Sequence, residues 1–155
     1  MTVDTRSGLR RARGEDASAV TALVRRAYGK YVARIGREPK PMTADYHAAI
    51  AAHQLWVLEE AGALVAVLEL IPAADHMLIE NVAVEPLEQG RGVGRRLMAF
   101  AEAEARRQGL RELRLYTNER FTENLALYAR LGYSVTRREP FKSTQIVHMA
   151  KQLDT

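Results

Sequence analysis

Residues 82–96 read VAVEPLEQGRGVGRR, and this stretch decides the fold of the chain. An apolar strand ends at Val84, a turn with alternating glycines follows, and a helix begins at about Gly92. Glycines at 90, 92 and 94 let backbone N–H groups point the same way, and the helix start adds its positive dipole. The segment therefore predicts a cradle for a pyrophosphate. The alternative is a tight strand-to-helix connection with solvated arginines.

The spacing of the glycines excludes two common phosphate sites. The chain has no Gly-Lys-Ser or Gly-Lys-Thr, so it lacks a P-loop. Counted from Gly90 or Gly92, the third glycine of a dinucleotide-binding G-x-G-x-x-G is replaced by arginine or leucine. One pattern does fit, Q/R-x-x-G-x-G/A, and it is supplied by Gln89, Gly92 and Gly94.

This pattern resembles the coenzyme A loop of the GNAT superfamily of N-acetyltransferases. The resemblance includes LIENVAV at 78–84 and NLALYARLGY at 124–133, so it covers residues 78–133 in the family's order. It implies an α/β (α+β) fold in which residues 1–155 form a single N-acetyltransferase domain. The central sheet would be mixed and mostly antiparallel, with six to seven strands flanked by about four helices. Acetyl-CoA would be the co-substrate.

Hydrophobic periodicity and turn residues predict the individual elements. Asp16 is expected to cap a first helix, and Thr43 a short helix that ends at Ala52. Two further helices are expected at about 92–108 and 121–131. Residues 36–41 are expected to form a loop between helical segments. The expected strands are 9–13, 54–60, 63–71, 77–84, 111–117, 133–138 and 145–149.

Composition narrows the class of protein. The chain has 155 residues, 47% of them hydrophobic, which suits one domain with one core. The net charge of +4 lies entirely in residues 81–155, which hold 13 basic and 9 acidic side chains. We expect a cytoplasmic protein without nucleic-acid or membrane partners, and no metal site, because the four histidines lack ligand spacing. With no cysteine, a covalent cysteine intermediate is excluded, which favours direct transfer in a ternary complex.

Two side chains are candidates for the chemistry. Glu80 lies in an otherwise apolar strand, where a half-buried carboxylate is suited to accept a proton. The resemblance implies that it deprotonates the acceptor amine, directly or through water; the alternative is a salt-bridged structural acid. Tyr128 matches the family's tyrosine that protonates the leaving thiolate. Alternatively, it belongs to an apolar stripe, with its hydroxyl satisfied locally.

The resemblance also assigns the coenzyme site. The backbone of the strand before the loop would bind the pantetheine arm, with an N–H near Val82 polarising the thioester carbonyl. The N–H groups from about Gln89 to Arg95 would hold the pyrophosphate, and Asn124 would contact pantetheine or steady a helix start. The predicted coenzyme-binding residues are Val82, Ala83, Val84, Gln89, Gly90, Arg91, Gly92, Val93, Gly94, Arg95 and Asn124.

The acceptor site carries the weakest signal. The resemblance places it beside the N-terminal helices, where the candidates are Tyr28, Tyr31 and Tyr46, with Met42, His47 and Trp56 nearby. Such aromatic residues suit an amine with an apolar body, although they are also common in cores. Residues 141–144 could close over the site, and a homodimer through the C-terminal strands is possible. The expected activity is acetylation of a primary amine on a small molecule or peptide. The alternatives are a non-catalytic acyl-CoA sensor and a transferase of longer acyl groups.

Overall fold

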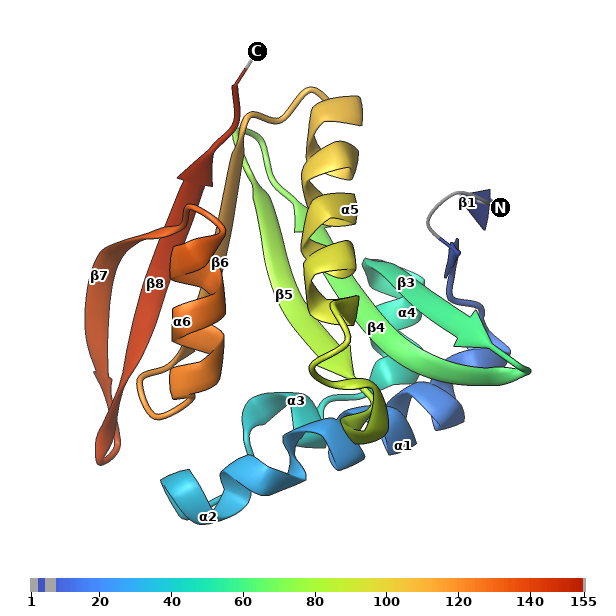
Figure 1. The fold of residues 1–155 in the computed structure, drawn as a ribbon, viewed down its shortest axis with the longest axis horizontal. Helices are drawn as coiled ribbons and strands as arrows, with labels where there is room; N and C mark the ends of the chain where they lie inside the picture. The colour runs from blue at the N-terminus through green and yellow to red at the C-terminus, as the bar shows by residue number, and fades with distance from the viewer. Residues whose placement is uncertain (1–2, 5–7, 155) are drawn as a thin grey trace.

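The computed structural model describes residues 3–4 and 8–154, which form a single sheet with helices on both faces (Figure 1). The strand order is β1-β2-β3-β4-β5-β6-β8-β7. The strands are β1 (Val3–Asp4), β2 (Leu9–Arg11), β3 (Gln54–Glu60), β4 (Ala63–Pro72), β5 (Met77–Val84), β6 (Glu112–Asn118), β7 (Ser134–Phe141) and β8 (Thr144–Gln152). The α-helices are α1 (Ala17–Tyr28), α2 (Val32–Ile35), α3 (Lys40–Thr43), α4 (Tyr46–Ala52), α5 (Val93–Arg107) and α6 (Thr122–Arg130).

The sheet is mixed, as the sequence predicts. Every neighbouring pair of its strands is antiparallel except β5 and β6, which run parallel. The predicted fold class is therefore confirmed. The two-residue strand β1 is an addition at the edge that the sequence pattern does not indicate, because it is too short to show alternation.

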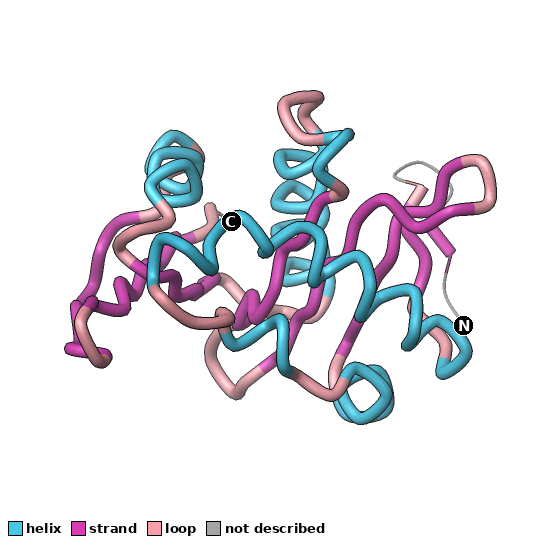
Figure 2. The backbone as a smooth tube through the Cα atoms, turned by 90° about the horizontal axis from the view of Figure 1, so that it is seen from below, coloured by secondary structure: helices cyan, strands magenta, loops and turns pink. Residues whose placement is uncertain are grey.

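The apolar core lies in two layers, one on each face of the sheet. Figure 2 shows α5 and α6 on one face and the N-terminal helices on the other. On the first face Leu97, Ala101 and Ala105 of α5 are fully buried against the sheet, at the spacing of one face of a helix. On the second face Val20 and Leu23 of α1 are equally buried. The sheet between them is thus held in place from both sides.

The two parallel strands separate part-way along their length. β5 and β6 pair only from Met77 with Leu113 to Ile79 with Leu115. Beyond that point β5 continues to Val84 beside β4, and β6 continues beside β8 (Figure 1). Among the described residues, no strand covers the β6-facing edge of β5 after Ile79. An unpaired backbone edge therefore lies in the middle of the sheet.

A β-bulge lies at the point of separation. Between β4 and β5 the register changes from Leu70 opposite Ile79 to Glu69 opposite Asn81, which leaves Glu80 as the extra residue. Ile79 packs into the α5 layer, whereas the Asn81 side chain bonds Tyr46 on the opposite face. The bulge thus breaks the alternation of the strand and sets the direction of Glu80.

Two predicted helix caps are wrong. Asp45, and not Thr43, caps α4, because its Oδ1 accepts a hydrogen bond from the Ala48 N–H at 3.1 Å. Thr43 instead ends α3 and bonds the Lys40 carbonyl. Asp16 does not cap α1 through its side chain; its carboxylate binds the Arg10 guanidinium at 2.8 Å and the Arg13 N–H at 2.7 Å. Both aspartate and threonine suit a cap, so residue type alone does not identify the capping side chain.

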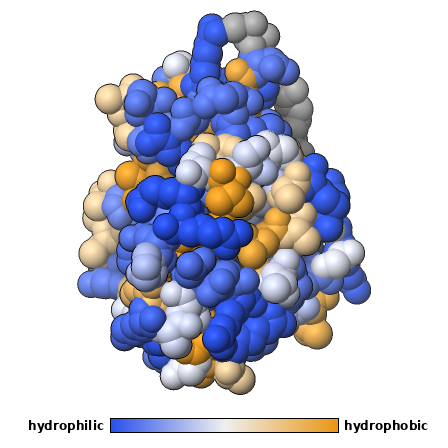
Figure 3. All heavy atoms as spheres, turned by 90° about the vertical axis from the view of Figure 1, so that its left-hand side faces the viewer, coloured by the Kyte–Doolittle hydropathy of each residue, from blue (hydrophilic) through white to orange (hydrophobic). Residues whose placement is uncertain are grey.

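The surface near the C-terminal strands is mainly polar. Figure 3 looks at the side of the molecule where β7 forms the edge of the sheet, and it shows hydrophilic side chains around small apolar patches. Seven of the eight β7 residues are exposed, Val135 and Phe141 among them. Within the described residues, no helix is long and apolar enough to cross a membrane.

Candidate active site

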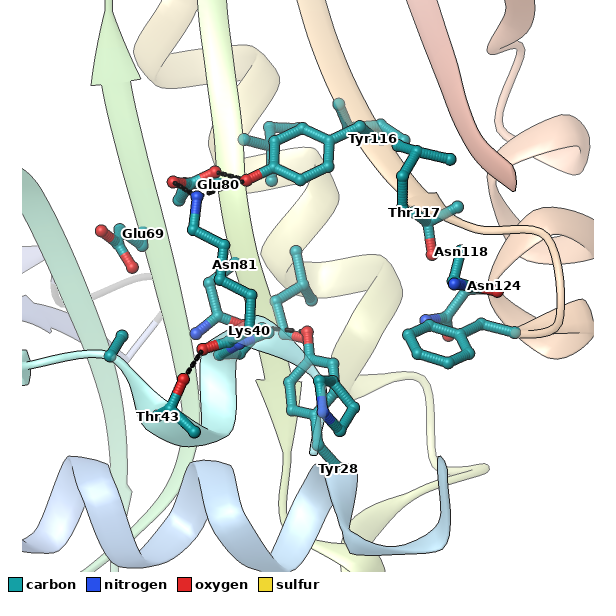
Figure 4. Close-up of a pocket in the computed structure, with 18 of the residues that line it drawn as sticks. Tyr28, Lys40, Thr43, Glu69, Glu80, Asn81, Tyr116, Thr117, Asn118 and Asn124 are labelled. Atoms are coloured by element: carbon teal, nitrogen blue, oxygen red, sulfur yellow. Dashed lines mark hydrogen bonds and ion pairs between the residues drawn. The ribbon is translucent and has the colours of Figure 1, made fainter. Parts of the chain in front are cut away.

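A cavity of about 930 Å³ occupies the opening between β5 and β6. Its wall combines side chains from α1, α3, α4, α6, the strands β4, β5 and β6, and the turn between β7 and β8. Figure 4 shows those from α1, α3, α6 and the three strands. Polar side chains that line the cavity include Tyr28, Arg37, Lys40, Tyr46, His53, Glu69, Glu80, Asn81, Tyr116, Asn124, Tyr128, Glu139, Lys142 and His148. Segments from both halves of the chain thus meet at one place.

Glu80 is held by a tyrosine from the neighbouring strand. Tyr116 extends from β6 toward β5, and its hydroxyl donates a hydrogen bond to Glu80 Oε1 at 2.5 Å (Figure 4). Lys40 Nζ lies 3.7 Å from Glu80 Oε2 and 3.2 Å from the Tyr116 hydroxyl. Burial and the nearby Glu80 carboxylate raise the pKa of Tyr116, so its phenol stays protonated. The carboxylate, 19% exposed, is therefore fixed in direction and still open to the cavity.

The wall below Glu80 is a chain of hydrogen bonds. The Tyr28 hydroxyl donates to Asn81 Oδ1 at 2.9 Å, and Asn81 Nδ2 donates to the Tyr46 hydroxyl at 2.9 Å. Tyr46 in turn donates to the Pro41 carbonyl at 2.6 Å. Burial raises the pKa of both tyrosines, which keeps them neutral. Two of the three predicted acceptor tyrosines thus line the cavity, but their hydroxyls are already occupied.

A second carboxylate in the cavity is one that the sequence interpretation missed. Glu69 of β4 is buried, and its Oε2 lies 2.7 Å from His53 Nδ1 at the end of α4. Burial raises the pKa of Glu69, and the hydrogen bond to His53 opposes that rise. The available signal was a glutamate inside the otherwise apolar stretch 63–71, the same signal that marked Glu80.

The Tyr128 hydroxyl has no hydrogen-bond partner among the described residues. Tyr128 is buried on α6 and lines the cavity, but its hydroxyl makes no hydrogen bond to any described residue. Burial raises its pKa, so the phenol is neutral and keeps its proton. A local hydrogen bond, the alternative considered from sequence, is therefore missing within the described chain. Asn124 lines the cavity one turn earlier and accepts a long bond from Tyr31 at 3.5 Å.

The glycine turn presents a row of unused donors. Gly90 and Gly92 have φ of +84° and +81°, a conformation that favours glycine. In the described part of the chain, nothing accepts a hydrogen bond from the backbone N–H groups of residues 90–95, which lead into α5. Gln89 braces the turn, because its side chain donates to the Val84 carbonyl and accepts from Lys30. Such a row at a helix start fits a pyrophosphate.

Comparison with known proteins identifies the family. Residues 19–133 match the acetyltransferase (GNAT) family. The chain belongs to this family. Mouse N-alpha-acetyltransferase 80 is 46% identical to this GNAT protein over 59 residues, which are 38% of the chain and 18% of the mouse protein. The match therefore spans less than a fifth of that relative.

Solved structures resemble this GNAT protein over nearly its whole length. The PaiA N-acetyltransferase from Thermoplasma acidophilum in complex with coenzyme A has a TM-score of 0.78 at 17% identity, covering 98% of this chain and 99% of that one. The ribosomal-protein-S18-alanine N-acetyltransferase from Escherichia coli has a TM-score of 0.77 at 19% identity, covering 95% and 94%. YncA from Salmonella typhimurium with acetyl-CoA has a TM-score of 0.72 at 24% identity, covering 95% and 94%. At these identities the likeness concerns the fold.

Several residues predicted for the acceptor site lie elsewhere in this GNAT chain. Tyr31 is buried against the Phe121 ring, with 4.0 Å between the ring centroids, and is not part of the cavity wall. Trp56 packs edge-on against Phe100 in the core. Met42 and His47 are also outside the wall, whereas Phe141 and Lys142 of the predicted closing loop belong to it.

Proposed function

We propose that this GNAT protein is an acetyl-CoA-dependent N-acetyltransferase that acetylates a primary amine by direct transfer. The observation that carries the proposal is the meeting of Glu80 and Tyr128 in one cavity. One offers a fixed carboxylate, and the other offers a neutral hydroxyl with no partner among the described residues. A base and an acid on opposite sides of an opening suit an amine attacking a thioester.

The donor side fits coenzyme A by its backbone. The unpaired edge of β5, with Val82, Ala83 and Val84, could add the pantetheine arm as a further strand. The free N–H groups of residues 90–95 would hold the pyrophosphate, with the exposed Arg91 and Arg95 beside them. Acetyl-CoA would supply the activated acetyl thioester. An N–H of the β5 edge would stabilise the developing oxyanion.

The side chains would move the protons. A primary amine is largely protonated at neutral pH, so it must lose a proton before attack. Glu80 would accept that proton at the carboxylate that Tyr116 holds in place. The Tyr128 hydroxyl would donate its proton, or a strong hydrogen bond, to the leaving sulfur. Because the chain has no cysteine, the acetyl group would pass directly to the amine.

The acceptor class follows from the cavity and from the relatives. An amine on a small molecule fits the cavity of about 930 Å³ between β5 and β6. The names of the mouse and Escherichia coli relatives make a peptide α-amine a second candidate.

The test is thiol release from acetyl-CoA over a panel of amines, combined with calorimetry of acetyl-CoA binding. Glu80→Gln should lower kcat/KM by about 10²- to 10⁴-fold, the usual contribution of a general base, and leave acetyl-CoA affinity unchanged. Glu139→Gln is the control, because Glu139 lines the same cavity but is bonded to His148 at 2.5 Å. Binding without release for any amine would favour the sensor alternative. Faster thiol release from acyl-CoA donors with longer chains would favour a transferase of longer acyl groups.

A further inference from the structure

Most carboxylates of the cavity wall have a hydrogen-bond or ion-pair partner. Glu69 bonds His53, and Glu80 bonds Tyr116 beside Lys40. At the opposite end Glu139 bonds His148 at 2.5 Å, and Glu38 binds Arg25 at 2.7 Å. Asp45 also lines the cavity and has no ion pair with a described residue, but its Oδ1 accepts the Ala48 N–H as the cap of α4. Two cations of the wall also lack an ion pair with a described residue.

Arg37 is the first of these cations. It lies in the loop after α2, is half-buried and lines the cavity. None of its guanidinium nitrogens makes a hydrogen bond or ion pair with a described residue, and Nη1 is fully shielded from solvent. Its guanidinium group lies over the Phe141 ring, whose centroid is 5.5 Å from the guanidinium carbon. A guanidinium normally finds acceptors when it leaves water, so this one lacks a ligand.

A second cation lies beside it. Lys142 occupies the turn between β7 and β8 with φ of +55°, lines the cavity, and has its Nζ 5.8 Å from the centroid of the same Phe141 ring. It too has no ion pair with a described residue. Two segments distant in sequence thus place two unpaired cations around one ring, which is itself 41% exposed.

We propose that Arg37, assisted by Lys142, binds a carboxylate of the acceptor, so that the acceptor is a small aminocarboxylate. This inference rests on the proposed function. Arginine binds a carboxylate through two parallel hydrogen bonds and fixes its orientation. The carboxylate would supply the missing acceptors of the Arg37 guanidinium and place the amine at the Glu80 end. A diamine would instead bring a second positive charge toward two unpaired cations.

The experiment uses three acceptor series of matched length: ω-amino acids from glycine to 6-aminohexanoate, n-alkylamines and α,ω-diamines. Thiol release should favour an ω-amino acid over the alkylamine and diamine of equal length. Arg37→Gln should raise the KM of that amino acid about 10- to 100-fold, the usual effect of losing a charged hydrogen bond, and change alkylamine KM less than about 2-fold. Arg37→Lys should recover part of the loss, since it keeps the charge without the fork.

Arg130→Gln is the matched control. Arg130 ends α6, is exposed and lies outside the cavity wall, so its loss removes the same charge without touching the site. Its kinetics should equal those of the wild type. Thermal melting should show that Arg37→Gln folds normally, because the variant removes a group that has no hydrogen bond in the described protein.

Each outcome decides one proposal. If amines react but Arg37→Gln leaves the KM of every ω-amino acid unchanged, the carboxylate site is overturned and the transferase stands. If no amine reacts, the transferase proposal fails. Calorimetry with hexanoate then tests the carboxylate site at Arg37 independently of any reaction. Hexanoate binding that is lost in Arg37→Gln supports the carboxylate site, and binding that is undetectable or equal in both proteins overturns it.

Discussion

The proposed donor side and the proposed acceptor side of this GNAT protein are built in different ways. The donor side would use consecutive residues, from the free edge of β5 through the glycine turn into α5, and it would offer mainly backbone atoms. The acceptor side uses side chains from three strands, several helices and a distant turn. A backbone site can be recognised in a short stretch of sequence, whereas a side-chain site exists only after the chain has folded.

The sharpest test of this comparison is Gly92→Val on the donor side. A residue with a side chain at a φ of +81° costs about 1–2 kcal/mol and would move the turn out of its conformation. The N–H groups of residues 90–95 would then no longer converge. We expect acetyl-CoA affinity to fall about 100-fold or more, the equivalent of one or two charge-assisted hydrogen bonds. Isothermal titration with acetyl-CoA measures it.

Gly109→Val is the control for that strain. Gly109 follows α5 with a φ of +78°, and at both glycines an added Cβ meets no atom within 4 Å. The two variants should therefore lose similar melting temperature, while only Gly92→Val loses coenzyme affinity. Equal losses of affinity would mean that general destabilisation is responsible, and the cradle would be refuted.

Tyr128→Phe tests the side chain that is proposed to protonate the leaving sulfur. It should lower kcat about 10²-fold, the lower range for a general acid, with acetyl-CoA affinity unchanged. Tyr133→Phe is a close control, because the Tyr133 hydroxyl is also buried without a partner among the described residues but lies outside the cavity wall. Unchanged turnover in Tyr128→Phe would remove Tyr128 from the mechanism.

The same comparison explains which parts of the fold and of the candidate site could be predicted from the sequence. The glycine turn, α5 and the hairpin of β3 and β4 follow from local rules, since glycine conformations and hydrophobic periods depend on neighbours in the chain. Glu80 and Tyr128 could be proposed because they lie within the family resemblance. Their surroundings could not, because strand pairing decides which side chains face each other.

Three acceptor-side features show this limit. Tyr116 reaches Glu80 only because β6 separates from β5, and Glu80 faces the cavity only because of a bulge that no composition signal marks. Arg37 and Phe141 are 104 positions apart and meet through tertiary packing. Conversely, Tyr31 and Trp56 are residue types that suit an aromatic pocket, but both are buried in hydrophobic clusters.

Tyr116→Phe sharpens the comparison on the acceptor side. Removing the hydroxyl deletes the 2.5 Å hydrogen bond to Glu80 and the 3.2 Å contact with Lys40. A bond to a charged group is worth about 1.5–3 kcal/mol, so we expect kcat/KM for the amine to fall about 10-fold. Steady-state thiol release measures it, and titration should show full acetyl-CoA affinity. A loss of coenzyme affinity instead would show that the two sides are not separable at this residue.

The smallest expected effect concerns an exposed ion pair between α2 and α6. Arg34 of α2 forms two hydrogen bonds with Glu123 of α6, at 2.5 and 3.1 Å, and Arg34 lowers the pKa of Glu123 from 4.5 to about 2. A carboxyl whose pKa is lower in the folded state stabilises the fold above pH 4.5, and this contribution is lost as the pH falls from 4.5 to 2. Both side chains are well exposed, so solvent screening limits it to about 0.2–1 kcal/mol.

Glu123→Gln should therefore reduce the free energy of unfolding at pH 7 by that small amount and match the wild type near pH 2. Urea unfolding at both pH values measures the difference, with Glu15→Gln as a control at an exposed ion pair away from the cavity. A gap that persists unchanged at pH 2 would contradict the assignment, because Glu123 would then stabilise the protein without its charge. The pair joins α2 on one face of the sheet to α6 on the other, so its weakness implies that the two faces are held together by the sheet and not by this surface contact.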